Sequence, residues 1–371
     1  MKLYLYYFKK IIKNLLFLLI LTLIIFLVYK IKSISNWFLL DNKRLEVISS
    51  SKIAIISFIE HGHEDNYLPA IKTVRCYALH NNYSYVLLND IDYPEFNKEC
   101  KQGEFYFKRH CVIAYYLHQK KDIFEYALII DADVALINPR HKLEYFLPKG
   151  NEEIIFYDRM FNDEIMAGSY MLKNSQYSRQ FLIWFADYYF KVPKYNDGYD
   201  NVALHAAFLD YVKDKKFTKQ YNHCMKIWST ASGYDLNMIF VSCMRWIIKK
   251  YSDNSSKDFA SFDNGKLIVL SKYSNRRWCR DTWLTSWKFC RNDFFLHGYK
   301  TNEYLKEGYT FLNEFNPTDK ECLREEYLWI WEYNKSSIVN CKIIKNSIKD
   351  WINFVDYDNS KNLHASGVLR I

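Results

Sequence analysis

The 371-residue sequence is poor in residues that interrupt regular structure, with ten Gly and six Pro. This scarcity excludes a collagen-like or linker-rich chain. Blocks of basic residues are also missing, because Lys and Arg alternate with Asp and Glu, and the net charge of +9 is modest for the length. No nucleic-acid partner is therefore expected. The motifs G-x-x-x-x-G-K, G-x-G-x-x-G and C-x-x-C do not occur, which argues against a P-loop, a dinucleotide fold, a zinc ribbon and a thioredoxin-like site.

Half of the residues are hydrophobic and a quarter are charged, as in a folded globular protein. A chain of this size buries a sufficient core without disulfides. The number of cysteines is nine, so at least one is unpaired or pairs between chains. Cys279 with Cys290 and Cys322 with Cys341 are plausible bridges in an oxidising lumen. Others, such as Cys111 and Cys243, are equally readable as small buried hydrophobes.

The N-terminal thirty residues contain an uncharged apolar run, Asn14 to Tyr29. A helix of this size spans about 25–30 Å, the short end of transmembrane lengths. More lysines precede the run than follow it, namely Lys2, Lys9, Lys10 and Lys13 against Lys30 and Lys32. We therefore expect a cytoplasmic tail and signal anchor at 1–30, a stem at 31–51, and a body in the Golgi or ER lumen, as in a single-pass type II membrane protein.

The alternative for this segment is a cleaved signal peptide, with Ser33-Ile-Ser35 as the cleavage site. Three N-glycosylation sequons, at Asn82, Asn254 and Asn334, agree with a lumenal body under either interpretation.

The body alternates apolar strand-like runs with helical patterns. Strands are expected at Lys52–Phe58, Tyr83–Leu88, Tyr126–Ile130, Val134–Ile137, Glu152–Tyr157, Ser169–Lys173 and Leu267–Leu270, and helices after Pro69 and at Phe107–Gln119, Ser175–Phe190, Asp200–Val212 and Met238–Lys249. This order predicts an α/β fold with a mixed, mostly parallel sheet flanked by helices and ligands at the carboxyl ends of the strands. We expect one catalytic domain at 52–300, a helical extension at 301–371, and a mobile surface segment at Tyr251–Asn264.

Two carboxylates interrupt the apolar sequence Ala127-Leu-Ile-Ile-Asp131-Ala-Asp133-Val-Ala-Leu-Ile137. Ionised carboxylates in such surroundings are costly unless a cation neutralises them. Oxygen ligands of this kind suit Mn²⁺ or Mg²⁺, which commonly share a site with substrate phosphates. Asp131 and Asp133 are therefore predicted metal ligands.

Two further D-x-D triplets carry weaker signals. Asp356 and Asp358 lie in a polar tail and are expected in a solvated turn. Asp90 and Asp92 precede Tyr93-Pro94, so a turn is the preferred interpretation. A contact with a nucleoside is the alternative for that pair.

The strand, D-x-D and second strand, in an expected type II membrane protein, resemble the GT-A nucleotide-sugar glycosyltransferases. The resemblance is closest to the galactosyl/mannosyltransferase branch and to an uncharacterised, nematode-expanded domain family similar to it. It covers roughly residues 52–300. Four further stretches carry it, namely Ile165-Met-Ala-Gly168-Ser-Tyr-Met-Leu-Lys-Asn174, Asp200-Asn201-Val-Ala-Leu204, His297-Gly298-Tyr-Lys300, and the basic pair Lys108-Arg109. Two features depart from the pattern, Tyr299 in place of a commoner Trp and insertion-like sequence between Val212 and Leu267.

The resemblance implies roles for these residues. His297 would complete the metal shell of Asp131 and Asp133, and Lys300 would meet the donor diphosphate. Further donor contacts would come from Lys108, Arg109, Gly298 and Gly168, while Asp200 and Asn201 would face the anomeric centre. The activity implied is hexosyl transfer, with retention of configuration, from a nucleotide-diphosphate sugar to a glycan, protein or lipid acceptor, dependent on Mn²⁺ or Mg²⁺.

Other interpretations stay open for these residues. His297 alone would fit a core histidine, Asp200-Asn201 an N-cap, and His61-Gly-His63 an exposed loop or a base or phosphate contact. The aromatic helix around Phe181 and Trp184 is expected in the core, and Trp278, Trp283 and Trp287 either pack or stack on a sugar. At the level of function, the alternatives are a catalytically inactive glycan-binding or scaffold protein and a lumenal metal-dependent phosphoesterase or nucleotidyltransferase.

Overall fold

The structure is a computed structural model that describes residues 48–89, 91–193, 200–212, 217–307 and 310–371, together with Thr22 and Phe26. Apart from Thr22 and Phe26, the expected signal anchor lies outside these residues, as does the stem before residue 48. Within the described part of the chain, no helix is both long enough and apolar enough to cross a membrane. Residues Ser50–Ile371 form one compact unit, and the features below belong to it.

The centre of this unit is an eight-stranded mixed sheet in the order β2-β1-β3-β6-β5-β9-β8-β7. Its strands are β1 (Ile53–Ile59), β2 (Ser84–Asn89), β3 (Tyr126–Ile130), β5 (Ile154–Tyr157), β6 (Ser169–Lys173), β7 (Asn254–Ser255), β8 (Phe259–Phe262) and β9 (Leu267–Leu270). The pairs β1–β2, β1–β3 and β5–β9 are parallel, whereas β6 runs antiparallel to both β3 and β5. β1, β5 and β9 are buried along their whole length, which explains their continuous apolar sequences.

A second, three-stranded sheet has the order β10-β11-β4. It contains β4 (Val134–Leu136), β10 (Cys279–Asp281) and β11 (Phe295–His297). The predicted strand at Val134–Ile137 therefore exists but leaves the main sheet, because β4 pairs antiparallel with β11. The chain crosses from one sheet to the other between Ile130 and Val134, which is the position of the D-x-D triplet.

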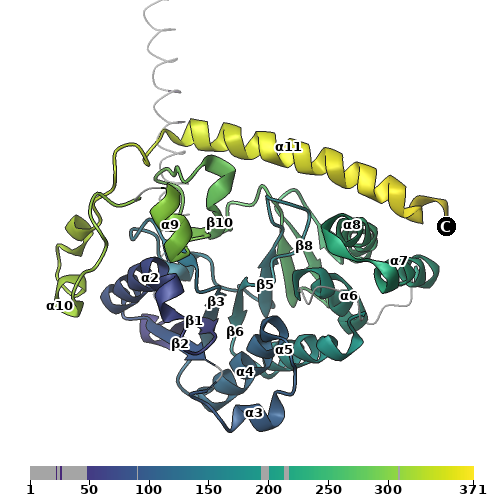
Figure 1. Ribbon diagram of the computed structural model, residues 1–371, viewed down its shortest axis with the longest axis horizontal. Coiled ribbons are helices and arrows are strands. Elements are labelled where there is room, and N and C mark those ends of the chain that lie inside the picture. The colour runs from purple at the N-terminus through teal and green to yellow at the C-terminus, as the bar shows by residue number, and fades with distance from the viewer. Residues whose placement is uncertain are drawn as a thin grey trace, which may run out of the picture. The chain divides into compact units, whose positions relative to one another are not determined.

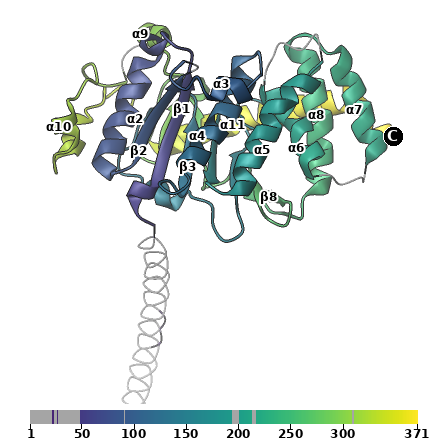
Figure 2. The same cartoon turned by 90° about the horizontal axis from the view of Figure 1, so that it is seen from below.

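The helices surround the main sheet, as Figures 1 and 2 show. They are α2 (Leu68–Asn81), α3 (Phe96–Glu99), α4 (Phe105–Gln119), α5 (Gln176–Asp187), α6 (Asp200–Val212), α7 (Thr218–Thr230), α8 (Gly233–Tyr251), α9 (Thr301–Glu307), α10 (Asp319–Cys322) and α11 (Cys341–Ser366). α2 packs on β2 and β4, and α4 packs on β1 and α5. In Figure 2, α5, α6, α8 and α7 follow one another side by side. The expected mixed α/β architecture with flanking helices is confirmed.

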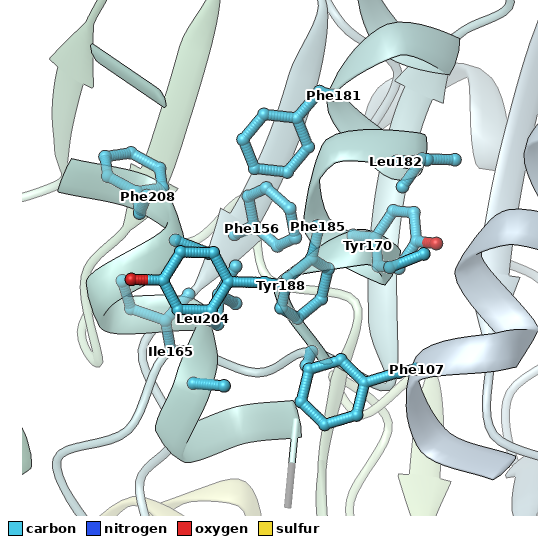
Figure 3. Close-up of a cluster of buried hydrophobic side chains, with 14 of the residues drawn as sticks. Phe107, Phe156, Ile165, Tyr170, Phe181, Leu182, Phe185, Tyr188, Leu204 and Phe208 are labelled. Carbon is cyan, nitrogen blue, oxygen red and sulfur yellow. The ribbon is translucent and has the colours of Figure 1, made fainter. Parts of the chain in front are cut away.

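The core lies between the main sheet and the helices α4, α5 and α6. Figure 3 shows it, with Phe107, Phe156, Ile165, Tyr170, Phe181, Leu182, Phe185, Tyr188, Leu204 and Phe208 labelled. Phe181 and Phe185, from the aromatic helix of the sequence, are fully buried. That helix is therefore a core element, as predicted, because its rings fill the space above β5 and β6.

The segment between Val212 and Leu267 is more ordered than the sequence suggests. It contains α7, which was not predicted, and a longer α8 that begins at Gly233 instead of Met238. The expected mobile segment at Tyr251–Asn264 is wrong, because α8 reaches Tyr251 and β7 and β8 extend the main sheet. The turn after β8 has positive φ angles at Asp263, Asn264 and Gly265, the Asn-Gly chemistry of a β-hairpin.

Four disulfides join the chain at Cys76–Cys322, Cys100–Cys111, Cys224–Cys243 and Cys290–Cys341, and Cys279 is a free, buried thiol. The odd cysteine is thus unpaired, as predicted, but both proposed pairings are wrong. Cys111 and Cys243 are bridged and are not merely buried hydrophobes. Spacing along the chain does not reveal that the first residue of α11 lies beside Cys290, or that α10 lies beside α2.

Candidate active site

Asp131 and Asp133 lie in the short turn between β3 and β4, where the amide of Val134 donates to the Asp131 carbonyl at 3.0 Å. β3 is buried in the main sheet and β4 is buried in the second sheet. Neither neighbouring strand can move without losing ladder hydrogen bonds, so both carboxylates are held on rigid supports.

His297 joins this pair from a distant part of the chain. It is the last residue of β11, and the β4–β11 register places it opposite Val134. Its Nε2 atom is 3.3 Å from Asp133 Oδ1 and 3.9 Å from Asp131 Oδ2. One ligand atom from each of the three side chains lies within 4.8 Å of the others. The structure therefore brings the three predicted metal ligands together.

Asp281 fixes the orientation of the imidazole. β10 runs parallel to β11 and its register places Asp281 beside His297. The His297 Nδ1–H donates to Asp281 Oδ1 at 2.7 Å, which leaves Nε2 directed at the two aspartates. The Arg159 guanidinium forms an ion pair with the same Asp281 oxygen at 3.1 Å. It forms a second ion pair with Glu164 at 3.2 Å. Asp281 was not among the predicted site residues, because nothing in Cys279-Arg-Asp281 marks a strand beside the His-Gly motif.

The charges in the cluster change the titration of its members. Burial lowers the pKa of His297, but Asp133 and Asp281 outweigh burial and raise it to about 10. Burial raises the pKa of Asp131 despite the nearby Arg109 guanidinium. The pKa of Asp133 is lowered, because His297 outweighs the effect of burial. Each of these shifts reflects the attraction between the imidazolium form of His297 and the carboxylates around it, set against burial.

Arg109 connects the metal-ligand pair to the opposite wall of the site. This side chain is buried on α4 and forms ion pairs with Asp131 Oδ1 and with Asp200 Oδ2. His110 Nε2 also binds Asp200 Oδ2, at 3.0 Å, while its Nδ1 contacts the Tyr170 hydroxyl at 3.0 Å. Burial raises the pKa of Asp200, but Arg109 and His110 outweigh this and keep it below its ordinary value. Asp200 is thus an ionised carboxylate at neutral pH.

Ala167 and Gly168, the two residues directly before β6, also contact residues of the site. Gly168 lies directly against the Asp131 carboxylate, and a β-carbon at this position would overlap it. The Asn201 side chain accepts a hydrogen bond from the Ala167 amide at 2.7 Å, which ties the start of α6 to this stretch. The side chains of Asp200 and Asn201 thus connect the start of α6 to α4 and to the stretch before β6.

These residues open into a pocket of about 590 Å³. Its acidic lining residues are Glu60, Glu104, Asp131, Asp133, Glu164 and Asp200, and its basic ones are Arg109, Arg159, His297 and Lys300. Carboxylates outnumber basic groups, so the pocket attracts cations. Lys300 is exposed at the pocket and forms no ion pair among the described residues. Within the described chain, this Lys is the basic side chain of the pocket most accessible to an anionic ligand.

Other predicted residues lie outside the pocket lining. Lys108, half-buried on α4, is not among the lining residues of the pocket, whereas its neighbour Arg109 is. Gly298 lies behind His297, where it has a φ of 107° and contacts Thr282 and Trp283 closely. Its amide and that of Tyr299 donate to the Asp133 carbonyl at 3.1 and 2.8 Å. Gly298 therefore helps to hold the turn that carries Asp133, and it is not among the lining residues of the pocket.

The remaining candidate residues have structural roles. Trp278 is buried and donates to Ser169 Oγ at 2.9 Å, and Trp287 packs on Tyr299. Trp283 contacts the edge of the His297 ring. His61 and His63 are exposed in a loop, as preferred from the sequence.

The described residues of the two other D-x-D triplets, Asp92, Asp356 and Asp358, do not line the active-site pocket. Asp92 lies in a turn in which Asn89 Oδ1 accepts its amide hydrogen at 2.8 Å, and Asp90 lies outside the described residues. Asp356 and Asp358 do not lie in a solvated turn but on α11, since packing of this helix on the body overrides its polar composition.

The donor set of the cluster fits a divalent cation. Two carboxylate oxygens and one neutral imidazole nitrogen suit Mn²⁺ and are compatible with Mg²⁺. Asp131 binds Arg109 through Oδ1 and keeps Oδ2 on the side of His297, and Asp281 supplies the carboxylate that commonly orients a metal-bound histidine. Three protein ligands leave further coordination positions for water or substrate oxygens.

Fold and cluster together define a mixed α/β protein with a candidate divalent-cation site where two sheets meet. Residues 74–313 match the family described as "Protein of unknown function, DUF273", and the chain belongs to this family. Among curated proteins, none matches the sequence. One solved structure with partial similarity is described as "crystal structure of a glycosyltransferase involved in the glycosylation of the major capsid of PBCV-1". It has 14% identity and a TM-score of 0.32, over 41% of this chain and 74% of that chain. A likeness at this level transfers no function.

Proposed function

We propose that the protein is a GT-A glycosyltransferase that moves a hexose from a nucleotide-diphosphate sugar to a glycan, protein or lipid acceptor, with Mn²⁺ or Mg²⁺ as its cofactor. One observation carries this proposal. Asp131 and Asp133 from the β3–β4 turn and His297 from the distant β11 direct three metal-binding atoms at the same point of a pocket that also contains the exposed Lys300.

The residues of the pocket have roles that suit this chemistry. Asp131, Asp133 and His297 would hold the cation, which neutralises charge on a departing nucleoside diphosphate. Lys300 supplies a point charge for the same phosphates. Asp200 uses Oδ2 for Arg109 and His110, and among the described residues no hydrogen bond is formed by Oδ1, so this oxygen would contact a ligand. An ionised carboxylate in this position would stabilise positive charge on the sugar or orient an acceptor hydroxyl.

The disulfides and sequons support a body in the secretory pathway, Golgi or ER. Four bridges require an oxidising compartment. Asn82 and Asn254 are exposed, so two of the three sequons are accessible to a glycan. Attachment to the membrane by a single N-terminal helix belongs to the same proposal.

Donor hydrolysis tests the activity without knowledge of the acceptor. The lumenal part, 48–371, is incubated with a panel of UDP- and GDP-sugars and Mn²⁺, and free sugar and nucleoside diphosphate are measured. We expect Asp131→Asn with Asp133→Asn to abolish hydrolysis. The control, Glu325→Gln with Glu326→Gln, removes the same charge at two exposed positions and should match wild type. Equal rates in all three proteins would refute the proposal, and release of nucleoside monophosphate would indicate phosphoryl transfer instead.

A further inference from the structure

A second concave region lies beside the active-site pocket and is lined by the C-terminal helix. We name this region of about 270 Å³ the α11 groove. Its lining consists of Phe161, Asn162, Asp163, Tyr234, Met238, Val241, Ser242, Trp351, Phe354, Val355, Asp358, Asn359 and Asn362. Phe161, Asn162, Tyr234 and Met238 also line the active-site pocket. The two regions are therefore neighbouring parts of a single depression that begins at the candidate metal ligands.

A series of aromatic contacts connects the metal ligands to this helix. The ring of His297 lies 5.5 Å from Trp283, and Trp283 lies 5.6 Å from Phe161. Phe161 then contacts Trp351 at 6.0 Å, and Trp351 contacts Phe354 at 6.2 Å. Phe161, Trp351 and Phe354 thus give the groove an aromatic lining, and Trp283, which lines neither region, connects Phe161 to the His297 ring.

Both kinds of group that recognise sugars are present in the groove. Phe354 and Tyr234 are 61% and 55% exposed, so their rings are open to a ligand. Around them are amide and carboxylate side chains, Asn162, Asn359, Asn362 and Asp358. The Oδ1 atoms of Asn359 and of Asn237, which lines the adjoining pocket and is 3% exposed, are buried without a hydrogen-bond partner among the described residues. A buried acceptor without a donor is costly, and a ligand hydroxyl would satisfy it.

α11 is held rigidly in this position. Its first residue, Cys341, is bridged to Cys290. Near its middle, Asp356 pairs with Lys272 at 3.0 Å. At its end, the Ser366 carbonyl accepts a hydrogen bond from His223 Nε2 at 2.6 Å. Figure 1 shows the helix crossing past β10 and β8 to α8. A wall fixed at three points is preorganised for binding.

We infer that the α11 groove binds a pyranose ring of the acceptor, with the hydrophobic face of the sugar on Phe354 and Tyr234 and its hydroxyls on the asparagines. This inference rests on the proposed function, since it makes the occupant an acceptor glycan. It also separates two tasks along the chain. The metal ligands lie inside the family-matched stretch 74–313, whereas α11 lies beyond it and would decide which acceptor is used.

A printed glycan array in EDTA tests the groove in the absence of metal and donor. It presents terminal galactose, mannose, glucose, fucose, xylose, N-acetylglucosamine and N-acetylgalactosamine, and its multivalent display detects weak binding. We expect residues 48–371 to bind at least one of these sugars. Phe354→Ala should weaken that binding about tenfold or more, because a stacking surface is lost. The matched control is Tyr357→Ala, which removes a ring that is 62% exposed on the same helix outside the groove, and it should bind like wild type.

The outcomes are decisive in each direction. Absence of binding to every sugar, undiminished binding by Phe354→Ala with Tyr234→Ala, or equal loss in Tyr357→Ala would overturn the inference. Because the substituted rings are exposed, their truncation leaves no cavity in the core. The melting temperatures of all variants should therefore equal that of wild type, which verifies that the variants are folded. If glycans bind in EDTA but no donor is hydrolysed, the sugar-binding role of the α11 groove stands and the proposed glycosyltransferase activity is refuted. If donors are hydrolysed but no glycan binds, the proposed activity stands and the sugar-binding role of the groove is refuted.

Discussion

Gly168 and Asp131 occupy adjoining positions across the antiparallel β3–β6 pair, and the Asp131 carboxylate fills the space where a side chain of residue 168 would lie. The glycine is therefore required by the carboxylate and not by backbone conformation, since its φ is not in the left-handed region. Because Gly168, directly before β6, has no side chain, the Asp131 carboxylate, directly after β3, can occupy this position.

Gly168→Ala should displace Asp131 and weaken Mn²⁺ binding. We expect a cost of about 1–3 kcal/mol in stability, measured by urea unfolding, and loss of the increase in melting temperature that Mn²⁺ gives wild type. The control is Gly103→Ala, whose β-carbon would meet the tip of the flexible Tyr189 side chain. If Gly168→Ala retains the full Mn²⁺-dependent increase, the close approach to Asp131 has no role in metal binding.

Asp281→Asn should weaken metal binding although Asp281 is not a metal ligand. Its carboxylate fixes His297 with Nε2 toward the two aspartates, and loss of such an outer partner typically costs about 10- to 100-fold in metal affinity. Isothermal titration with Mn²⁺ measures the change. Asp356→Asn, which removes a carboxylate remote from the cluster, should leave Mn²⁺ affinity unchanged, and an equal loss in both variants would point to a general charge effect.

Arg109→Met should destabilise the fold strongly. It removes the guanidinium shared by Asp131 and Asp200, which leaves Asp131 with His297 and Asp200 with His110 as their remaining partners. Breaking a buried ion pair in this way costs about 3–5 kcal/mol. Arg109→Lys should recover only part of this, because an ammonium cannot reproduce the two-sided geometry of a guanidinium. Equilibrium unfolding of the three proteins decides the point, and full recovery by Lys would show that charge alone matters.

Asp163, which is not one of the candidate metal ligands, should make the stability of the fold depend on pH. Burial raises the pKa of Asp163, but Arg245 and Lys272 outweigh burial and lower it below its ordinary value. A carboxylate with a lowered folded-state pKa stabilises the fold above its unfolded pKa of about 3.9, and this stabilisation is lost as the pH falls through the folded-state value. Asp163→Asn should therefore be less stable than wild type by about 3 kcal/mol at pH 7.

The difference between Asp163→Asn and wild type should shrink below about pH 4. Urea unfolding at pH 7, 5 and 3.5 measures it. The partly exposed Asp356, the other partner of Lys272, provides the comparison, and Asp356→Asn should cost no more than about 1 kcal/mol at any of these pH values. A constant penalty for Asp163→Asn across the range would contradict the assigned pKa direction.

Many elements of the fold could be predicted from the sequence because their signals are local. β3, β6, α6 and β9 begin and end where the apolar patterns and caps indicate. The proximity of His297 to Asp131 and Asp133 was expected from the resemblance alone. Its physical basis, the pairing of β4 with β11, is a long-range contact with no local signature.

The elements that could not be predicted depend on tertiary contacts. α7 is largely polar, and its few apolar residues are buried by packing on α8. The Cys224–Cys243 disulfide joins the two helices. Asp281 and Arg159 enter the site through sheet register and an ion pair between distant segments. Lys108 and Arg109 are adjacent in sequence, and only the rotation of α4 determines which of them faces the pocket.

The Cys76–Cys322 bridge joins residues 246 positions apart, and every predicted metal ligand, together with Lys300, lies between them. A single proteolytic cut anywhere in this span leaves both fragments covalently attached. Nicked molecules would therefore migrate as intact protein on a non-reducing gel and separate only after reduction, so that damage near the catalytic centre stays hidden unless a thiol is added to the sample.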